Sequence, residues 1–388
     1  MLLVVGMTQT AAASPATATA RFASFNASLN RDSQGALLAD LSSPDDPQAQ
    51  QVAEVIQRTR PDVLLLNEFD YVPGYAAVDA FRENYLEVSQ NGAEPISYRY
   101  AYTAPVNTGV PTGFDLNHDG KVGGPGDAQG FGVFPGQYGM VVLSQYPIVT
   151  EQVRTFREFL WKDMPGALLP DDPSTPAPAD WYSDAALDVL RLSSKSHWDV
   201  PVRVNGTVQH FLVSHPTPPV FDGAENRNGR RNHDEIRFWA DYVTPGQGSY
   251  IYDDSGERGG LPGGESFVIA GDMNADPVDG DSVAGAIGQL LEAPRVHDPR
   301  PGSAGGVVAA IRQGGANTTH TGNPYHDTAD FGDDAPGNLR VDYVLPSEDL
   351  VPLRRSVFWP LPNSGHAGLN DASDHHLVWV DLLIQSGH

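Results

Sequence analysis

Residues that can bind a metal ion or move a proton stand at the ends of short apolar runs in this sequence. Asn26, Glu68, His215 and Asp272 each end or follow such a run. One polar ending of this kind carries little information, and for Glu68 the alternative is a glutamate at a strand end in water. Four endings together predict that one rim of a sheet carries a polar cluster.

Asp272 and Asn274 belong to the segment Gly271-Asp-Met-Asn274, which follows an apolar run. Two residues apart on an extended chain, their side chains face the same way. An acid and an amide in that arrangement can orient a water molecule and hold a phosphoryl oxygen. The alternative is an Asx turn at the end of a strand.

A second chemical pattern lies near the C-terminus, where Ser373-Asp-His375 precedes an apolar run. An imidazolium beside a scissile phosphate needs a carboxylate that keeps it charged and oriented. Asp342 meets that need if its strand neighbours that of His375. Asp374 can accept a proton or bind a metal ion. The alternative is a set of solvent-facing polar residues before a final strand.

The elements that must position these residues follow from the apolar patterns. Strands are expected over residues 21–26, 63–68, 210–215, 267–272, 340–345 and 376–382. Helices are expected over residues 48–59, 232–243 and 281–291. Asn205-Gly206 tolerates positive φ at both turn positions, which predicts a type I′ hairpin between residues 200–204 and 207–213.

Four stretches rich in glycine and proline lack periodicity and are interpreted as long loops. They cover residues 104–137, 164–180, 244–265 and 299–338. Loops of this length in a compact domain are uncommon unless they are functional or held by a metal ion. No internal repeat or linker interrupts the pattern, so we expect one decorated α/β domain over residues 21–385.

The composition limits which partners and which metal-binding groups the protein can use. Acidic residues outnumber basic ones 49 to 24, the formal charge is −25, and the lysines are Lys121, Lys162 and Lys195. Such a charge repels polyanions at long range and disfavours nucleic acid as the main partner. No cysteine occurs, so a metal ion must be bound by carboxylate, amide or imidazole groups, which favours a hard cation such as Mg²⁺.

Taken in order, these motifs resemble the endonuclease/exonuclease/phosphatase superfamily. The matching pieces are Phe25-Asn26, Leu66-Asn-Glu68, Tyr138-Gly-Met-Val-Val-Leu-Ser144, Ser214-His215, Gly271-Asp-Met-Asn274, Val341-Asp-Tyr343 and Ser373-Asp-His375. The resemblance spans roughly residues 21 to 383. It implies a deoxyribonuclease-I-like four-layer α/β sandwich, in which two central β-sheets pack face to face under outer helices.

The resemblance also implies roles. Glu68 would be the principal ligand of Mg²⁺, or of Mn²⁺ or Ca²⁺ in its place. Asn26, Asp374 and Asp272 would lie near the ion. Asp272 would also orient or deprotonate the attacking water, Asn274 would hold phosphate, and Tyr138 would face the substrate. Asp342 would pair with His375, with His215 as the second histidine at the scissile group.

Other segments modify this picture. Arg227, Arg230 and Arg231 open an expected helix, and guanidinium groups at a helix N-terminus suit phosphate oxygens. We expect them to bind substrate; the alternative is that they pair with nearby acids. His197, just before the hairpin, is either a pocket residue or a buried, hydrogen-bonded histidine.

A partial calcium-loop pattern lies in the first long loop. Asp115, Asn117 and Asp119 occupy positions 1, 3 and 5, and Lys121 would contribute its backbone carbonyl. The acid expected at position 12 comes one residue later, at Asp127. A structural Ca²⁺ ion would hold this insertion together, and the alternative is an Asp/Gly-rich turn without an ion.

The sequence thus predicts a secreted, metal-dependent phosphatase or phosphodiesterase, monomeric and without a membrane span, that acts on small or lipid-derived phosphate esters. Residues 1–20 begin apolar and continue rich in threonine and alanine, which we interpret as part of a secretory signal or as a disordered N-terminus. A secreted nuclease with the same machinery is the main alternative. A binding protein that keeps the fold without catalysis is a third.

Overall fold

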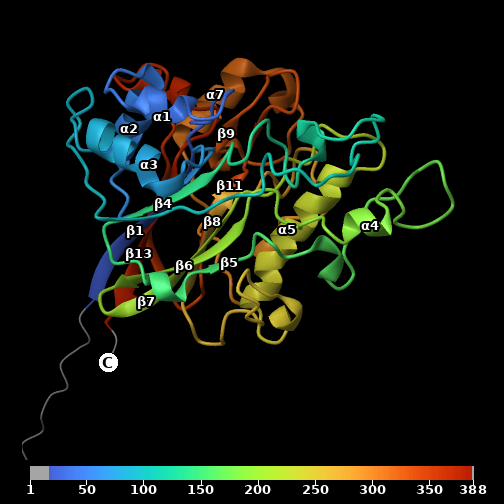
Figure 1. Cartoon of the computed structure of the whole chain (residues 1–388). Coiled ribbons are helices and arrows are strands. Elements are labelled where there is room, and N and C mark those ends of the chain that lie inside the picture. The colour runs from blue at the N-terminus through green and yellow to red at the C-terminus, as the bar shows by residue number, and fades with distance from the viewer. Residues whose placement is uncertain (1–16, 387–388) are drawn as a thin grey trace, which may run out of the picture.

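Two β-sheets form the centre of the protein in the computed structural model, which describes residues 17–386 (Figure 1). The first sheet has the strand order β12-β13-β1-β2-β4-β3. In that order its strands are Val351–Val357, Val378–Gln385, Thr17–Asn26, Val63–Asn67, Met140–Ser144 and Tyr100–Tyr102. β1 and β2 run parallel, and β13 runs antiparallel to β1.

The second sheet has the order β11-β8-β7-β6-β5. In that order its strands are Asp342–Pro346, Phe267–Asp272, Thr207–Ser214, His197–Val204 and Arg154–Thr155. β7 and β8 run parallel, and β11 runs antiparallel to β8. A small separate ladder pairs β9 (Ala329–Asp330) with β10 (Asn338–Leu339).

Helices cover the outer faces of both sheets. The α-helices of the described residues are α1 (Ala36–Leu41), α2 (Pro47–Thr59), α3 (Ala76–Phe81), α4 (Asp184–Leu187), α5 (Arg227–Val243), α6 (Gly288–Leu291) and α7 (Ala304–Gln313). A π-helical turn spans Arg82–Leu86, and short 3₁₀ turns lie at Pro73–Tyr75, Pro125–Asp127, Thr150–Gln152, Trp161–Asp163, Gly248–Tyr250, Gly315–Thr318, Pro324–His326 and Ala367–Ala372. In Figure 1, α1 to α3 (blue) and α5 (yellow) lie on opposite sides of the strands.

Strand periodicity explains the layers. Phe22 and Leu65 of the first sheet pack with Phe211 and Val268 of the second in one buried cluster between the sheets. Their neighbours along the strands point outward, so that Phe25, for example, packs in the cluster beneath α1 to α3. Side chains that alternate between two buried faces are what a sheet covered on both sides requires. The predicted sandwich of two packed sheets between helices is confirmed.

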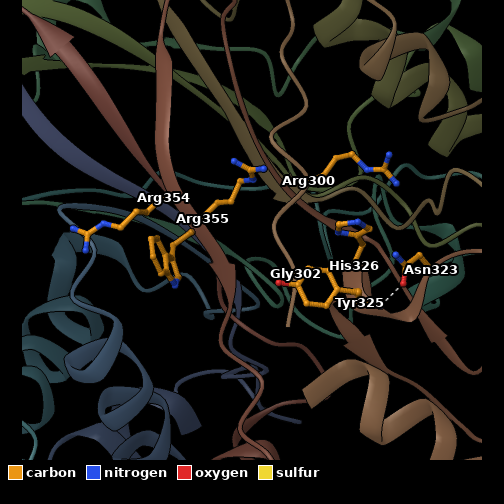
Figure 2. Close-up of a pocket in the computed structure, with 8 residues that line it drawn as sticks. Arg300, Gly302, Asn323, Tyr325, His326, Arg354 and Arg355 are labelled. Carbon is orange, nitrogen blue, oxygen red and sulfur yellow. Dashed lines mark hydrogen bonds between the residues drawn. The ribbon is translucent and has the colours of Figure 1, made fainter. Parts of the chain in front are cut away.

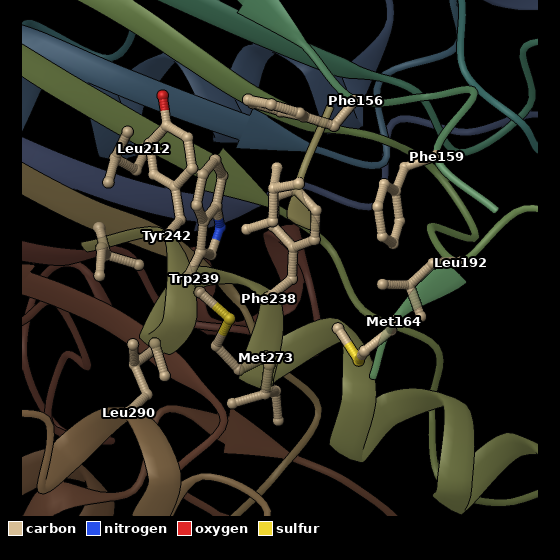
Figure 3. Packing of buried hydrophobic residues seen from close by; sticks show 14 of the residues in the cluster. Phe156, Phe159, Met164, Leu192, Leu212, Phe238, Trp239, Tyr242, Met273 and Leu290 are labelled. Carbon is tan, nitrogen blue, oxygen red and sulfur yellow. The ribbon is translucent and has the colours of Figure 1, made fainter. Parts of the chain in front are cut away.

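The outer face of the second sheet packs against α5. Phe238, Trp239 and Tyr242 of this helix meet Phe156 and Phe159 of a neighbouring loop (Figure 3). The rings of Phe156 and Phe238 lie 5.1 Å apart in an edge-on arrangement. Each fully buried side chain of this size contributes about 1.5–3 kcal/mol by leaving water, so the cluster fixes α5 against the sheet.

The helix predictions were partly correct. α2 begins one residue earlier than expected, where Pro47 follows the N-cap Asp46, whose side chain accepts a hydrogen bond from Ala49 N. α5 begins at Arg227, before the expected residue 232. Its first turns are polar, so no apolar period in the sequence marked where the helix begins. The helix expected over residues 281–291 is wrong except for α6, since Gly285 takes a left-handed φ of 79° and interrupts it.

The loop predictions need one correction. The stretch 299–338 contains α7, which begins after Ser303, whose hydroxyl accepts from Gly306 N. The type I′ hairpin is confirmed, with positive φ at Asn205 (50°) and Gly206 (84°). Residues 17–20 of the expected N-terminal tail belong to β1 and pair with β13, and the rest of that tail lies outside the described residues. Between residues 17 and 386, no helix is both long and apolar enough for a membrane crossing.

Candidate active site

Strand direction brings the predicted residues to one edge of the sandwich. Because β1 and β2 are parallel, Asn26 and the residue before Glu68 end side by side. Because β11 is antiparallel to β8, its first residue, Asp342, pairs with the last residue of β8, Asp272. β13 likewise begins where β1 ends, which places the segment before it, including His375, at the same edge.

Asp272 lies at the centre of this cluster. Its Oδ2 accepts a hydrogen bond from Asn26 Nδ2 at 3.1 Å and lies 3.3 Å from His215 Nε2 and 3.7 Å from His375 Nε2. The side chain is 1% exposed. Burial raises the pKa of Asp272 to about 7, although the charge of His375 opposes this. A carboxylate whose pKa is near neutrality can exchange a proton with water at working pH.

The backbone around Asp272 depends on a glycine. A Cβ at Gly271 would lie 2.1 Å from the carbonyl oxygen of Ser214, so any side chain there would force β7 and β8 apart. Beyond Asp272, Asn274 takes a left-handed φ of 50° and its N–H donates to Asp272 Oδ1 at 2.9 Å. Asn274 Nδ2 donates to Pro216 O, which places this amide beside the loop that follows His215.

His375 and Asp342 form a buried pair. His375 Nδ1 lies 2.8 Å from Asp342 Oδ2. The same oxygen accepts a hydrogen bond from the Thr328 hydroxyl at 2.9 Å. Burial alone would lower the pKa of His375, but the charges of Asp342 and Asp272 raise it well above its ordinary value. His375 is therefore an imidazolium at neutral pH, oriented by the carboxylate behind it.

The pKa of His215 is shifted in the opposite direction to that of His375. It is 2% exposed, and its Nδ1 has no hydrogen-bond partner among residues 17–386. Burial lowers the pKa of His215 well below its ordinary value, and the positive charge of His375 adds to this. The two histidines that flank Asp272 thus differ in charge, one cationic and one neutral, which separates their chemical roles.

Oxygen donors suited to a hard cation gather beside this cluster. Glu68 has a left-handed φ of 59°, and its Oε1 accepts from Asn26 Nδ2 at 3.1 Å. Burial raises the pKa of Glu68, against hydrogen bonding from Asn26. Asp374 is exposed, and its Oδ1 accepts from the Ser28 hydroxyl. Carboxylate and amide oxygens such as those of Glu68, Asp374 and Asn26 are the donors that a hard divalent cation prefers.

Geometry alone also brings together Asp272, Asp342 and His375, whose ligand atoms lie within 4.8 Å of one another. This buried acidic and imidazole group could bind a metal ion. Asp342 and His375 are, however, already hydrogen bonded to each other, and His375 carries a positive charge. We therefore favour Glu68 as the principal ligand and the His375–Asp342 pair as a proton-bearing group.

Asp70 is a site residue that the sequence interpretation missed. Its Oδ1 accepts from Tyr138 N at 3.0 Å and its Oδ2 accepts from Arg31 N at 2.8 Å. It thereby holds Tyr138, whose φ is 54°, beside Glu68. Burial raises the pKa of Asp70 to about 6. An acid two residues after Glu68 was the available signal, but only the fold shows which backbone groups it binds.

The helix-opening arginines make contacts within the protein, and their predicted substrate binding stays a prediction. Arg227 forms an ion pair with Glu225, and Arg230 donates to the carbonyl of Leu169. Arg231 donates to the carbonyls of Leu192, Gln129 and Arg191. These guanidinium groups are used inside the protein, as the alternative interpretation held for Arg227, so the structure does not place them as free phosphate ligands.

His197 is also corrected. It is 1% exposed, its Nδ1 contacts the Ser193 hydroxyl, and its Nε2 lies 2.8 Å from the carbonyl of Glu235. Burial lowers the pKa of His197 to about 4, so the ring is neutral. With both nitrogens engaged, it is the buried, hydrogen-bonded histidine of the alternative interpretation.

Helix α5 holds several site segments together. The carboxylate of Glu235 accepts from Ser194 N and from Thr217 N, both at 2.6 Å. Asn232 Nδ2 donates to the carbonyls of Thr217 and Met273, at 2.8 and 2.9 Å. One face of the helix thus ties the loop after His215 to the loop after Asp272. Sequence reasoning could not find this role, because it depends on contacts between distant segments.

The calcium-loop pattern folds as a compact turn. Asp115 accepts hydrogen bonds from Asp119 N and Gly120 N, and Asp119 Oδ1 accepts from Lys121 N. Asp127 is buried and accepts from Leu116 N and Gly123 N. The acids therefore lie around one loop, but these contacts are equally those of a turn without an ion, and the calcium site stays a prediction.

A separate hollow of about 750 Å³ is lined by arginine and aromatic side chains (Figure 2). Its lining residues are Arg300, Gly302, Asn323, Tyr325, His326, Arg354, Arg355 and Trp379. None of these residues belongs to the cluster around Asp272. The hollow is therefore not the place where the proposed chemistry is carried out.

Comparison with known proteins agrees with the geometry. Residues 23–375 match the sequence profile described as "Endonuclease/Exonuclease/phosphatase family". No curated protein matches this sequence. The fold is similar to that of an endonuclease/exonuclease/phosphatase from Beutenbergia cavernae DSM 12333, with a TM-score of 0.50, 17% identity, and coverage of 95% of this chain and 72% of that chain.

Two other solved structures are more distant. A family protein from Bacteroides thetaiotaomicron has 12% identity and a TM-score of 0.48, with 97% of this chain and 98% of that chain covered. Sphingomyelinase C from Streptomyces griseocarneus has 14% identity and a TM-score of 0.44, with 94% and 99% covered. The family match covers nearly the whole described chain and includes the residues that converge on Asp272. The protein is thus a member of the endonuclease/exonuclease/phosphatase family.

Proposed function

We propose that this protein is a divalent-metal-dependent hydrolase of phosphate esters. The observation that carries the proposal is the convergence on one carboxylate, Asp272, of Asn26, a neutral His215 and a cationic His375. An acid with a pKa near 7 beside an imidazolium, with oxygen donors for a cation alongside, supplies what water attack at phosphorus requires. Hydrolysis of phosphoesters is also the chemistry of the family.

Each residue has a part in the proposed reaction. Asp272 accepts the proton of the attacking water as the water oxygen forms its bond to phosphorus. The ester P–O bond breaks on the opposite side, the leaving oxygen departs with the electron pair, and phosphorus inverts. His375, held by Asp342, donates a hydrogen bond to a phosphoryl oxygen that gains charge in the transition state.

A divalent cation bound by Glu68, with Asn26 and Asp374 nearby, would neutralise charge on the phosphoryl oxygens. His215, neutral and buried, has Nε2 directed at Asp272 and orients the attacking water with it. Asn274 is placed to hold a phosphoryl oxygen, since it follows Asp272 on the same loop. The identity of the ion, whether Mg²⁺, Mn²⁺ or Ca²⁺, belongs to this proposal.

The proposed substrates are small or lipid-derived phosphate esters acted on outside the cell. The formal charge of −25 opposes the approach of long polyanions, and the helix-opening arginines are used within the protein. A short ester carries little charge beyond its phosphate and meets less repulsion. Secretion, a monomeric state and a calcium ion in the Asp115–Asp127 loop remain parts of the proposal.

Turnover measured with and without metal ions tests the proposed hydrolase activity. We expect no activity after EDTA treatment and recovery with Mg²⁺ or Mn²⁺ on a panel of phosphomonoesters, phosphodiesters and phospholipids. Asp272→Asn should lose activity by orders of magnitude while its thermal unfolding stays cooperative. Equal lack of turnover on the whole panel, with and without metal, would refute the proposal. Rapid plasmid or RNA cleavage with little action on small esters would instead favour a nuclease.

A further inference from the structure

Lys195 is a buried lysine next to the active site that has no partner. The residue is 6% exposed. Within residues 17–386 its ammonium group makes no hydrogen bond and no ion pair, and its backbone carbonyl accepts from Asn107 N. Lysine is almost never buried without a partner, because desolvating its charge is costly. A buried ammonium group without a partner would be stabilised by an anion, and the described residues place no carboxylate within ion-pair distance of it.

The sheet places Lys195 beside the catalytic residues. It stands two residues before His197, the first residue of β6, which pairs with Ser214 of β7. The hydroxyl of its neighbour Ser194 donates to the carbonyl of His215 at 3.4 Å. Burial lowers the pKa of Lys195, and the charges of Glu235, Glu68 and Asp272 oppose this. The ammonium group is thus close to the proposed metal ligand and to the proposed base.

Glu235, the first of the acids whose charge acts on Lys195, does not neutralise it. Both oxygens of Glu235 are engaged by backbone N–H groups, those of Ser194 and Thr217. Glu235 therefore fixes the segment that carries Lys195 without forming an ion pair with its side chain. The same segment is packed tightly from the other side, since a Cβ at Gly130 would lie 1.9 Å from the carbonyl of Ser194. The lysine is held in place while its charge is left unpaired.

We infer that Lys195 binds a non-bridging oxygen of the phosphoryl group, beside the residues that would hold a divalent cation. The inference rests on the proposed function and names a residue that its mechanism did not use. A phosphate monoester or diester group provides the anion that this buried charge lacks. Because the helix-opening arginines are engaged elsewhere, Lys195 is, beside His375, a basic side chain positioned for such a contact.

Binding of inorganic phosphate tests the inference directly. Calorimetry in the presence of Mg²⁺ would compare the wild type with Lys195→Met, which keeps the length of the side chain and removes the charge, and with Lys195→Arg, which keeps the charge. Lys162→Met is the matched control, since Lys162 is partly exposed and pairs with Asp188 at the surface. We expect phosphate affinity to fall about 10- to 100-fold in Lys195→Met and to be partly retained in Lys195→Arg.

Two further readouts separate substrate binding from a structural role. Loss of an unpaired buried charge should leave the Tm of Lys195→Met unchanged or higher. It should also lower the Mg²⁺ concentration needed for half-maximal binding, because a positive charge near Glu68 opposes the cation. Unchanged phosphate affinity, or a Tm well below that of Lys162→Met, would overturn the inference. If the wild type binds phosphate but turns over no ester, the proposed function fails while this binding result still decides the role of Lys195.

Discussion

Replacing Asp342 by asparagine keeps the size of the side chain and removes its charge, which makes it a sharp probe of the His375–Asp342 pair. Asp342 Oδ2 lies 2.8 Å from His375 Nδ1 and accepts from the Thr328 hydroxyl at 2.9 Å. An asparagine oxygen in that place can keep both contacts. Its NH₂ group then takes the position of Oδ1, which is buried without a partner among the described residues.

The expected effect on the rate follows from the lost charge. Without the Asp342 carboxylate, burial lowers the pKa of His375, and the ring becomes neutral near pH 7. A preorganised hydrogen-bond donor at an oxygen that gains charge is worth about 10²- to 10³-fold in rate, so kcat should fall by that factor, or about 3–4 kcal/mol of transition-state stabilisation. Relative to the wild type at the same pH, the remaining activity should recover as the pH is lowered, because the imidazolium then returns while protonation of Asp272 affects both proteins.

Steady-state kinetics on a phosphate ester from pH 5 to 9, with thermal unfolding in parallel, measures both effects. Asp371→Asn is the control, since it removes an exposed carboxylate four residues before His375. The reasoning is refuted if Asp342→Asn keeps kcat within about threefold of the wild type at pH 7 while the protein stays folded. A similar loss in Asp371→Asn would mean that the effect is one of general charge and not of the buried pair.

Three further predictions concern metal binding and stability. Glu68→Gln should raise the Mg²⁺ concentration for half-maximal activity at least about tenfold with a smaller change in Tm, and an unchanged Mg²⁺ titration would remove Glu68 from the ligand set. Burial, with Asp276 and Asp279 nearby, raises the pKa of Asp327 to about 8, so its ionised form is disfavoured in the folded state and stability is lost as pH rises from about 4 through 8. Asp327→Asn should therefore gain Tm over the wild type progressively between pH 5 and 8, whereas a gain independent of pH would contradict that origin. Millimolar Ca²⁺ should raise the Tm of the wild type but not of Asp119→Ala, and equal Tm values with and without Ca²⁺ would argue for a turn without an ion.

Much of the fold and of the catalytic cluster could be predicted because both follow from local signals. An apolar run that ends in Asp272 or Glu68 identifies a buried strand and its polar end at once. Relative strand directions then decide that these ends meet. The order of the motifs along the chain indicated those directions only through the resemblance to a family of known fold. The metal ion and the substrate remain proposals, because oxygen donors alone are compatible with several hard cations.

Residues that act through distant partners could not be assigned in this way. Thr328 supports Asp342 from a loop without any recognisable pattern, and Glu235 holds two loops by their backbone amides. Arg231 was expected at the phosphate because its charge was visible in the sequence, whereas the carbonyls that it binds belong to segments about 40 and 100 positions away. Charge can be read from a sequence, but the partner that satisfies it depends on the folded chain.

The hydrogen bonds of α5 to three loops join the cluster around Asp272 into one rigid unit. Glu235 and Asn232 connect the segments at Ser194, Thr217 and Met273 to a single rigid rod. A displacement of that rod would carry the two loops beside Asp272 along together and preserve their spacing. Sequence changes in the outer loops can therefore alter the surroundings of the proposed site while the side chains around Asp272 keep their alignment.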